Sequence, residues 1–295
     1  MSRTSKLLLW IGGFYVGMLI LLAVLFGVHG QKNTEFQVQN EFKLINWVHL
    51  GPLSINRGVV YLFLAAVATV VTMVYIANRM QARPNRVQTA VEAIYALMRE
   101  NITRGNMDDS MAARWFPFVG ALFLFIWFCN LIGYLPLPTN SEEKFNLFGA
   151  QIPSFALYAA TANISVPLIL ALVVFITFNY EGIKSHGFVG YVKSLIPEGV
   201  GKMVILIAPL EIISNFMRLI SLTIRLFANI LAGHMIILFM AGGLGVILGL
   251  AWLGWLSFPI GIAVYLFELG LVATLQAFIF ATLSAIYLGG AVSHH

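Results

Sequence analysis

Six polar or charged side chains recur along one apolar segment in the last third of the chain. They are spaced by 3, 4, 3, 4 and 4 residues, and they are Glu211, Ser214, Arg218, Ser221, Arg225 and Asn229. On an α-helix this spacing places all six side chains on one face. Arginine stays protonated in proteins, so Arg225 brings a permanent positive charge into the middle of an apolar segment. Such a side chain must face water, a carboxylate or both.

The charge of Arg225 requires a counter-charge. A charge at the centre of a bilayer costs about 2.5–3.5 kcal/mol even on the most lenient insertion scale. The apolar segments contain few carboxylates, so we expect a partner protein to supply the one that neutralises Arg225. For Arg218 a structural interpretation stays open beside a functional one. The side chain either extends to the membrane surface or pairs with Glu211.

A second set of polar residues follows. His234 lies nine residues after Arg225, about 180° around a helix, so it faces different surroundings. Glu268 lies in the middle of the last apolar segment and can face His234 across a hairpin, while Gln276 can approach Arg225. A buried Glu–His pair is suited to relaying protons, because histidine titrates near neutral pH. The alternative for His234 is a hydrogen-bonded packing residue.

Other kinds of chemistry have no signature in the sequence. It contains no glycine-rich phosphate loop, H-E-x-x-H motif, paired-cysteine metal site or serine nucleophile elbow. The single Cys129 lies in an apolar run, so a disulfide framework is not possible. We therefore predict no catalytic site, cofactor, metal or bound nucleotide in this chain.

The composition indicates what must hold these residues. Of 295 residues, 60% are hydrophobic and 10% are charged, and the mean hydropathy is +0.88. Soluble domains average roughly 45–50% apolar and about 25% charged residues. The chain is therefore interpreted as an integral membrane protein, which excludes a soluble enzyme, a secreted disulfide module and a disordered regulator. The net charge of +5 is attributed to membrane orientation, and no nucleic acid partner is expected.

Apolar runs predict an all-α fold of about six membrane helices. The runs lie at 7–28, 58–78, 115–137, 156–179, 203–241 and 250–290. A helix over 204–240 would be roughly 55 Å long, whereas the hydrocarbon core is about 30 Å thick. We expect this segment and 251–290 to form a hairpin of two strongly tilted helices. The turn is expected at the glycines between them, Gly242–Gly245 with Gly249 beyond.

Basic residues predict the orientation. Eleven Lys and Arg lie on the side of the N-terminus and of the 79–114 loop, and four lie on the other side. Both termini and this loop are therefore placed in the cytoplasm. Within the loop, apolar residues recur at helical spacing at Val87, Val91, Ile94, Tyr95, Met98 and Ile102. They predict an amphipathic helix at the membrane surface or against a partner, with a solvated connector helix as the alternative.

The string S-L-T-I-R-L-F-A-N-I-L-A-G-H, residues 221–234, resembles the signature of subunit a of F-type ATP synthases. Residues 114–136, 161–166 and 275–288 resemble other helices of that family, in the same order. The resemblance covers roughly residues 55–290. It divides the chain into an extra N-terminal membrane helix with an external loop (1–57) and a subunit a core (58–295).

The resemblance implies a stator subunit with two offset half-channels beside a rotating ring of c subunits. By that resemblance Arg225 is the essential arginine that faces the ring carboxylates, with Asn229 and Gln276 close to it. His234 and Glu268 would belong to the half-channel that opens to the outside.

Glu211 and Ser214 would belong to the cytoplasmic half-channel, and Ser221 and Arg218 complete the expected proton pathway. The implied partners are the c-ring, subunit b or other peripheral-stalk subunits, the rest of the F1Fo complex and the lipid bilayer. The expected location is the bacterial plasma membrane.

Two features depart from the family pattern. Glu268 precedes Gln276 by eight residues, whereas the family's acidic or histidine position precedes that glutamine by seven, here Leu269. One residue is about 100° of helix rotation, so the role of Glu268 requires a local bulge at Gly270. The helix at 7–28 is an addition to the common five-span form.

The alternative function is a self-contained secondary transporter or ion channel. That class predicts inverted repeats or helices broken by Gly and Pro around a midplane site. The sequence has neither feature. A purely structural membrane anchor would leave Arg225 and Glu268 unexplained.

Overall fold

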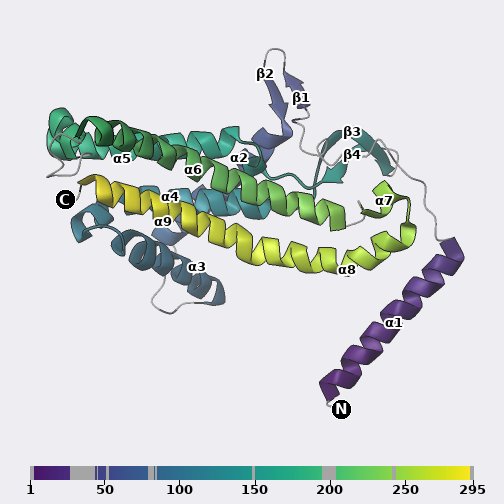
Figure 1. Cartoon of the computed structure of the whole chain (residues 1–295). Coiled ribbons are helices and arrows are strands. Elements are labelled where there is room, and N and C mark those ends of the chain that lie inside the picture. The colour runs from purple at the N-terminus through teal and green to yellow at the C-terminus, as the bar shows by residue number, and fades with distance from the viewer. Residues whose placement is uncertain are drawn as a thin grey trace. The chain divides into compact units, whose positions relative to one another are not determined.

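The computed structural model of the chain describes residues 3–26, 44, 46–50, 53–78, 83, 85–147, 150–194, 204–240 and 244–292 (Figure 1). The first half contains α1 (Arg3–Phe26), β1 (Asn46–Leu50), β2 (Leu53–Asn56), α2 (Arg57–Asn78), α3 (Arg86–Ala96), the π-helix η2 (Leu97–Arg104) and α4 (Asp109–Gly133). The second half contains β3 (Leu137–Leu147), β4 (Ala150–Ala156), the 3₁₀ turn η3 (Ala160–Ala162), α5 (Ser165–Ser194), α6 (Val204–Leu238), α7 (Leu244–Leu248), α8 (Ala251–Phe267), the π turn η6 (Glu268–Val272) and α9 (Ala273–Val292).

Five helices in the described ranges are long and apolar enough to cross a membrane. They are Arg57–Asn78, Asp109–Gly133, Ser165–Ser194, Ile207–Leu238 and Trp252–Val292. This confirms the predicted all-α integral membrane fold. The first expected membrane helix is present as α1. Its apolar stretch, Gly12–Leu21, is shorter than those of the five helices above. Whether α1 crosses the membrane stays a prediction.

The two long C-terminal segments are each one helical run. Helix α6 has 35 residues and is about 52 Å long. Helix α8, the π turn η6 and α9 follow one another without interruption, so Trp252–Val292 forms a run of 41 residues. The prediction that neither segment divides into two spans is confirmed, and their tilt in the bilayer stays a prediction.

The chain forms two compact units. The larger comprises Leu44–Leu231 and Leu271–His295, and the smaller comprises Met1–Lys43 and Ala232–Gly270. In the larger unit α4 packs against α2, η2 and α9, and α9 also packs against α5. Helix α9 buries an alanine at every fourth position, namely Ala273, Ala277, Ala281 and Ala285. Small side chains let helix backbones approach closely in a membrane, so this alanine stripe lets α9 lie in the core of the larger unit.

Buried polar side chains hold α4 to its neighbours. The amide of Asn130 donates to the carbonyl of Ala273 (3.3 Å) and accepts a hydrogen bond from the hydroxyl of Thr161 (2.8 Å). The indole N–H of Trp127 donates to the hydroxyl of Thr274 (3.0 Å). Polar groups in hydrocarbon must find partners inside the protein, so these bonds fix α9 against α4.

Helix α5 begins later than the apolar run predicted. The run starts at residue 156, but residues 157–164 are irregular or 3₁₀, and the helix starts at Ser165. The side chain of Asn163 accepts a hydrogen bond from the backbone N–H of Ser165 (3.0 Å), and Pro167 follows in the first turn, where a missing N–H is tolerated. These two features set the start of the helix.

The turn predicted at the glycines between the long segments is present at Gly249, the last of them. Gly242 and Gly243 lie outside the described residues. After them comes the short helix α7, and the chain reverses at Gly249, whose φ of 68° is in the left-handed region. A glycine adopts this conformation without the steric penalty of a side chain, so Gly249 ends α7 before α8 begins.

Two short antiparallel hairpins were not predicted. Strand β1 pairs with β2, and β3 pairs with β4 in a register that places Leu137 opposite Ala156. Strand β3 reads L-P-T-N-S-E-E-K-F-N-L, which lacks the apolar–polar alternation typical of a strand. The hairpins therefore have no clear signal in the sequence.

The amphipathic segment is helical, as predicted, but the part of it that is buried is shorter than the predicted apolar face. The side chain of Asn85 caps α3 by accepting from the backbone N–H of Gln88 (2.8 Å). Met98 and Ile102 of η2 are buried, and η2 packs against α4 and α9, whereas Val87 is 64% exposed. The segment therefore packs on its own chain through η2, and its contact with the membrane surface or a partner stays a prediction.

Candidate functional site

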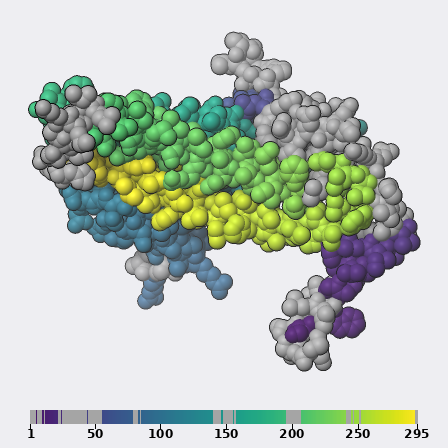
Figure 2. Space-filling model, viewed as in Figure 1, coloured from purple at the N-terminus to yellow at the C-terminus, as the bar shows by residue number. Residues whose placement is uncertain are grey.

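The polar stripe of α6 lies on an accessible face of the larger unit. Ser214, Ser221 and Asn229 are exposed, and Glu211, Arg218 and Arg225 are partly buried. Figure 2 shows green atoms of α6 along the face turned to the viewer. Next to the stripe, about 100° around the helix, Leu222, Leu226 and Ile230 each follow a stripe residue and are buried. The spacing of the stripe therefore predicted correctly that one helix carries it.

Arg225 makes no ion pair with any residue that the structure describes. Other arginines do form ion pairs: Arg99, Arg104 and Arg114 pair with Glu100, Asp109 and Glu181. The guanidinium thus lies on an accessible helix face with no described carboxylate of its own chain in contact. Its charge remains available to a carboxylate from outside.

Asn229 and Gln276, which were each expected near Arg225, are hydrogen-bonded to each other. The amide of Asn229, one turn after Arg225, donates to Oε1 of Gln276 (3.0 Å), which is 3% exposed on α9. This bond joins α6 to α9 beside Arg225. It also holds the Asn229 side chain on the stripe.

Arg218 does not pair with Glu211 in the described part of the chain. Its guanidinium lies over the ring of Tyr287, 5.2 Å from the centroid. A cation–π contact of this kind holds the charge against α9. Of the two structural interpretations of Arg218, pairing with Glu211 is therefore not seen among the described residues, and extension to the membrane surface stays a prediction.

A buried amide network beside the stripe was not predicted from the sequence. Oδ1 of Asn179 on α5 accepts from the hydroxyl of Tyr191 (2.9 Å) and from the amide of Asn215 on α6 (3.1 Å). Asn215 and Tyr191 are both buried. Asn215 directly follows Ser214, about 100° away from the stripe. A polar residue off the stripe in an apolar helix was the available signal.

Arg114 and Glu181 form the second feature missed. Arg114 Nη1 lies 2.7 Å from Oε1 of Glu181, whose side chain is only 7% exposed. The pair joins α4 to α5 across 67 positions of sequence. An acid inside an apolar helix was visible in the sequence, but nothing in the spacing identified its partner.

In the smaller unit, Glu268 lies beside the Gly233–His234 turn of α6. His234 is 2% exposed and Glu268 is 8% exposed, and both make interactions. The Glu268 carboxylate lies so close to Gly233 that a β-carbon there would be 2.8 Å from Oε1 and closer still to its other atoms. The predicted approach of Glu268 to this part of α6 is therefore present, and it depends on glycine at position 233.

The π turn η6 accounts for the eight-residue spacing between Glu268 and Gln276. Glu268 is the first residue of this turn and Gly270 lies inside it. A π turn holds one more residue than an α turn. Eight residues that include it therefore cover about the rotation that seven cover in a regular α-helix. The bulge that the sequence required at Gly270 is present.

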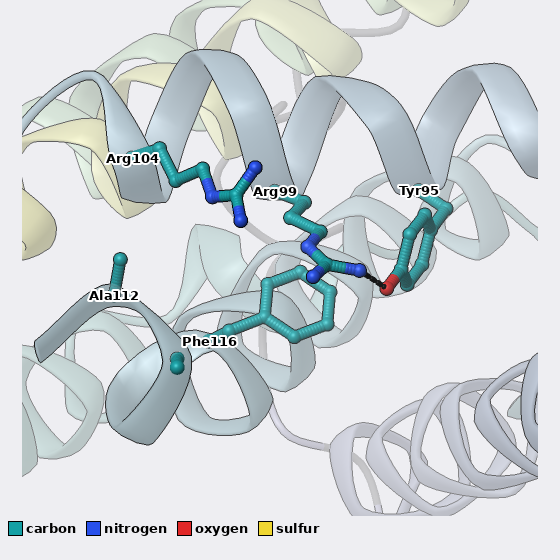
Figure 3. A pocket seen from close by; sticks show the side chains of 6 residues that line it. Tyr95, Arg99, Arg104, Ala112 and Phe116 are labelled. Atoms are coloured by element: carbon teal, nitrogen blue, oxygen red, sulfur yellow. Dashed lines mark hydrogen bonds between the residues drawn. The ribbon is translucent and has the colours of Figure 1, made fainter. Parts of the chain in front are cut away.

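A surface pocket of about 210 Å³ lies between α3, η2 and α4 (Figure 3). Its lining is Tyr95, Arg99, Arg104, Ala112, Ala113 and Phe116. Arg99 donates to the Tyr95 hydroxyl (2.6 Å), and the hydrogen-bonded Glu100 carboxylate raises the pKa of Arg104. None of the predicted site residues lines it, and the described residues contain no cluster suited to a metal ion.

The chain is similar in sequence to a known protein family and to several of its members. The model of the family described as ATP synthase A chain matches residues 59–289. ATP synthase subunit a of Anaeromyxobacter dehalogenans is 32% identical over 243 residues, which are 81% of this chain and 58% of the relative. The subunits a of Rubrobacter xylanophilus and Maricaulis maris are each 34% identical, over 80% and 81% of this chain and 83% and 89% of their own lengths.

The chain spans between half and three fifths of the length of the two Anaeromyxobacter dehalogenans relatives. The matched region nevertheless contains every predicted site residue, from Glu211 to Gln276. The chain belongs to the ATP synthase A chain family.

Proposed function

We propose that the chain is the proton-translocating stator subunit of an F-type ATP synthase. In this role it provides two offset half-channels and one fixed arginine at the interface with a rotating c-ring. The observation that carries the proposal is Arg225, a permanent charge on an accessible face of an unbroken helix, without a carboxylate partner among the described residues.

The mechanism follows from the cost of moving charge through lipid. A ring carboxylate crosses the apolar surroundings only when protonated, because the charged form is too costly there. At the stator it releases its proton into one half-channel and passes Arg225 as an ion pair. It then takes a proton from the other half-channel. A proton moving through 100 mV makes about 2.3 kcal/mol available, which drives rotation.

The fixed charge of Arg225 also separates the two half-channels. A permanent cation repels protons and keeps them from crossing directly between the channels. The bond between Asn229 and Gln276 supports this assignment, because it holds polar side chains beside Arg225. Arg218, held over Tyr287, adds a second positive charge along the same helix.

We assign His234 and Glu268 to the half-channel open to the outside. Both are buried, and Glu268 lies against the turn that contains His234. A histidine beside a carboxylate can accept and release protons near neutral pH. Glu211, Ser214 and Ser221 are assigned to the cytoplasmic half-channel, because they lie on the accessible stripe of α6.

The remaining roles follow from this assignment. The chain carries no catalytic site and binds no nucleotide or cofactor; ATP chemistry belongs to other subunits. Its partners are the c-ring, subunit b or other peripheral-stalk subunits, and the rest of the F1Fo complex. We place it in a bacterial plasma membrane with both termini in the cytoplasm, with residues 1–57 as an N-terminal addition to the core 58–295. A self-contained transporter needs broken helices around a midplane site, and the unbroken α6 does not favour it.

Arg225→Ala in the assembled complex tests the proposal. We expect proton-driven ATP synthesis in vesicles to be abolished. The complex should stay assembled, because the substitution removes a charge but little of the volume packed in the core. Passive proton leak should rise as the barrier between half-channels falls. Arg225→Lys should also be severely impaired, because lysine lacks the planar guanidinium and can lose its proton in apolar surroundings. Wild-type synthesis by the assembled Arg225→Ala complex would refute the proposal.

A further inference from the structure

Helix α8 contains a proline that leaves one backbone carbonyl without its helical donor. Pro259 lies inside α8 and has no backbone N–H. In a regular helix that N–H would bond to the carbonyl four residues earlier, which is the carbonyl of Trp255. Pro259 therefore frees the Trp255 carbonyl inside an otherwise hydrogen-bonded helix.

The hydroxyl of Tyr15, on α1, donates to this same carbonyl. Tyr15 also lies 3.3 Å from the carbonyl of Leu256, the next residue. Helices α1 and α8 belong to the same compact unit and pack against each other. Figure 2 shows purple atoms of α1 against the yellow-green segment. The contact therefore joins residues about 240 positions apart in the sequence.

The surroundings make this bond matter. Leu256, Phe258 and Ile260 on α8 are exposed apolar side chains, and so are Trp10 and Phe14 on α1. In a bilayer such surfaces face lipid, and no water is present to satisfy a free carbonyl. A donor from a neighbouring helix can replace the missing N–H there. Tyrosine is suited to this, since its body is apolar and its tip carries a donor.

We propose that α1 is a brace for α8, and that Tyr15 supplies the hydrogen bond that Pro259 removes. In this role Tyr15 is a positioning residue: it fixes α8, the helix that leads into the π turn beginning with Glu268. The proposal gives a role to the N-terminal helix. It stands on the contact between α1 and α8 and does not depend on the proposed proton translocation.

Four variants of the full-length chain, kept in its complex in native membranes, test the proposal. They are Tyr15→Phe, Pro259→Ala, the double variant, and Tyr180→Phe as a control at an exposed tyrosine of α5. The readout is hydrogen–deuterium exchange of backbone amides between residues 256 and 263. Loss of one hydrogen bond corresponds to about a fivefold change in an opening equilibrium.

We expect Tyr15→Phe to speed exchange in this segment about fivefold, and Tyr180→Phe to leave it unchanged. Pro259→Ala restores the backbone N–H, so Tyr15→Phe should have no further effect in that background. An equal effect in both backgrounds would overturn the proposal, because Tyr15 would then act by packing alone. No effect of Tyr15→Phe in the wild-type background would overturn it as well.

A second measurement keeps the test valid if Pro259→Ala fails to accumulate. Pro259→Gly restores the same backbone N–H. It then takes the place of Pro259→Ala, both alone and in the double variant with Tyr15→Phe. Independently, the pair Tyr15→Cys and Leu256→Cys in a Cys129→Ala background should be joined by a short bis-maleimide in intact membranes. Failure to cross-link, in protein that labels at each single cysteine, would contradict the contact between α1 and α8.

Discussion

Arg114, Arg218 and Arg225 differ in how their charge is compensated. Arg114 pairs with Glu181, and Arg218 lies over Tyr287. Arg225 has neither kind of partner among the residues that the structure describes. A permanent charge in an apolar helix is maintained only where something outside the helix compensates it. The contrast therefore singles out Arg225 as the arginine poised for an external carboxylate.

His234→Ala tests the assignment of the outer half-channel. We expect proton-driven ATP synthesis to fall by about a hundredfold, at the lower end of the range for a lost general acid–base group, while the complex still assembles. The loss should change with external pH, because the missing imidazole titrates near neutral pH. ATP synthesis in vesicles with an imposed gradient, repeated at several external pH values, measures this. An unchanged rate and pH profile would identify His234 as a packing residue.

Gly233→Ala tests the position of Glu268. A β-carbon at position 233 would collide with the Glu268 carboxylate, so that side chain must move. We expect synthesis to fall nearly as far as in Glu268→Ala, although no polar group is removed. Gly290→Ala is the matched control, since a β-carbon there meets no atom within 4 Å. If both glycine variants behaved like the wild type, the contribution of Glu268 to ATP synthesis would not depend on its position beside His234.

At the residue scale, spacing predicted which side chains share a helix but not which ones meet. The intervals of three and four placed Glu211 to Asn229 on one face without any tertiary information. The bond between Asn130 and the Ala273 carbonyl joins positions 143 apart, and Asn179 and Asn215 come from different helices. Such pairs depend on helix packing, which no local periodicity encodes.

At the scale of elements, the bilayer explains why the helices were predictable. Backbone groups in lipid must bond within their own segment, so a long apolar run has one solution, a helix. The strands β1 to β4 lie outside the spans, where this constraint does not apply and short-range pairing decides. The contact of α1 with α8 was likewise not predicted, because it depends on one hydroxyl and one proline.

The π turn η6 leads to a prediction at the same scale. Because the turn already corrects the register of Glu268, exchanging Glu268 and Leu269 should rotate the carboxylate by about 100° away from its position. We expect the exchanged variant to lose as much proton-driven synthesis as Glu268→Ala. The exchange leaves the composition of the helix unchanged, so we expect the complex to assemble. Assembly is checked in parallel. Wild-type activity would mean that the π turn does not set the register.

At the scale of the whole molecule, the accessible stripe of α6 implies a partner. A helix that carries Arg225 together with exposed apolar side chains such as Ile220 and Ile224 is costly in lipid and unproductive in isolation. It becomes favourable against a ring whose carboxylates supply the opposite charge. The family match over 59–289 agrees with such a partner.

Isolation from native membranes tests this at the same scale. The chain carries no nucleotide-binding motif, so any ATP-dependent activity that purifies with it must come from associated subunits. With an affinity tag at the C-terminus and a mild detergent, we expect a ring of small apolar subunits and a nucleotide-binding head to copurify. ATP hydrolysis should then be present in the preparation, and Arg225→Ala should retain these partners while losing proton-driven synthesis. A self-contained transporter would instead purify alone and move its substrate in vesicles without a ring, which would contradict the stator assignment.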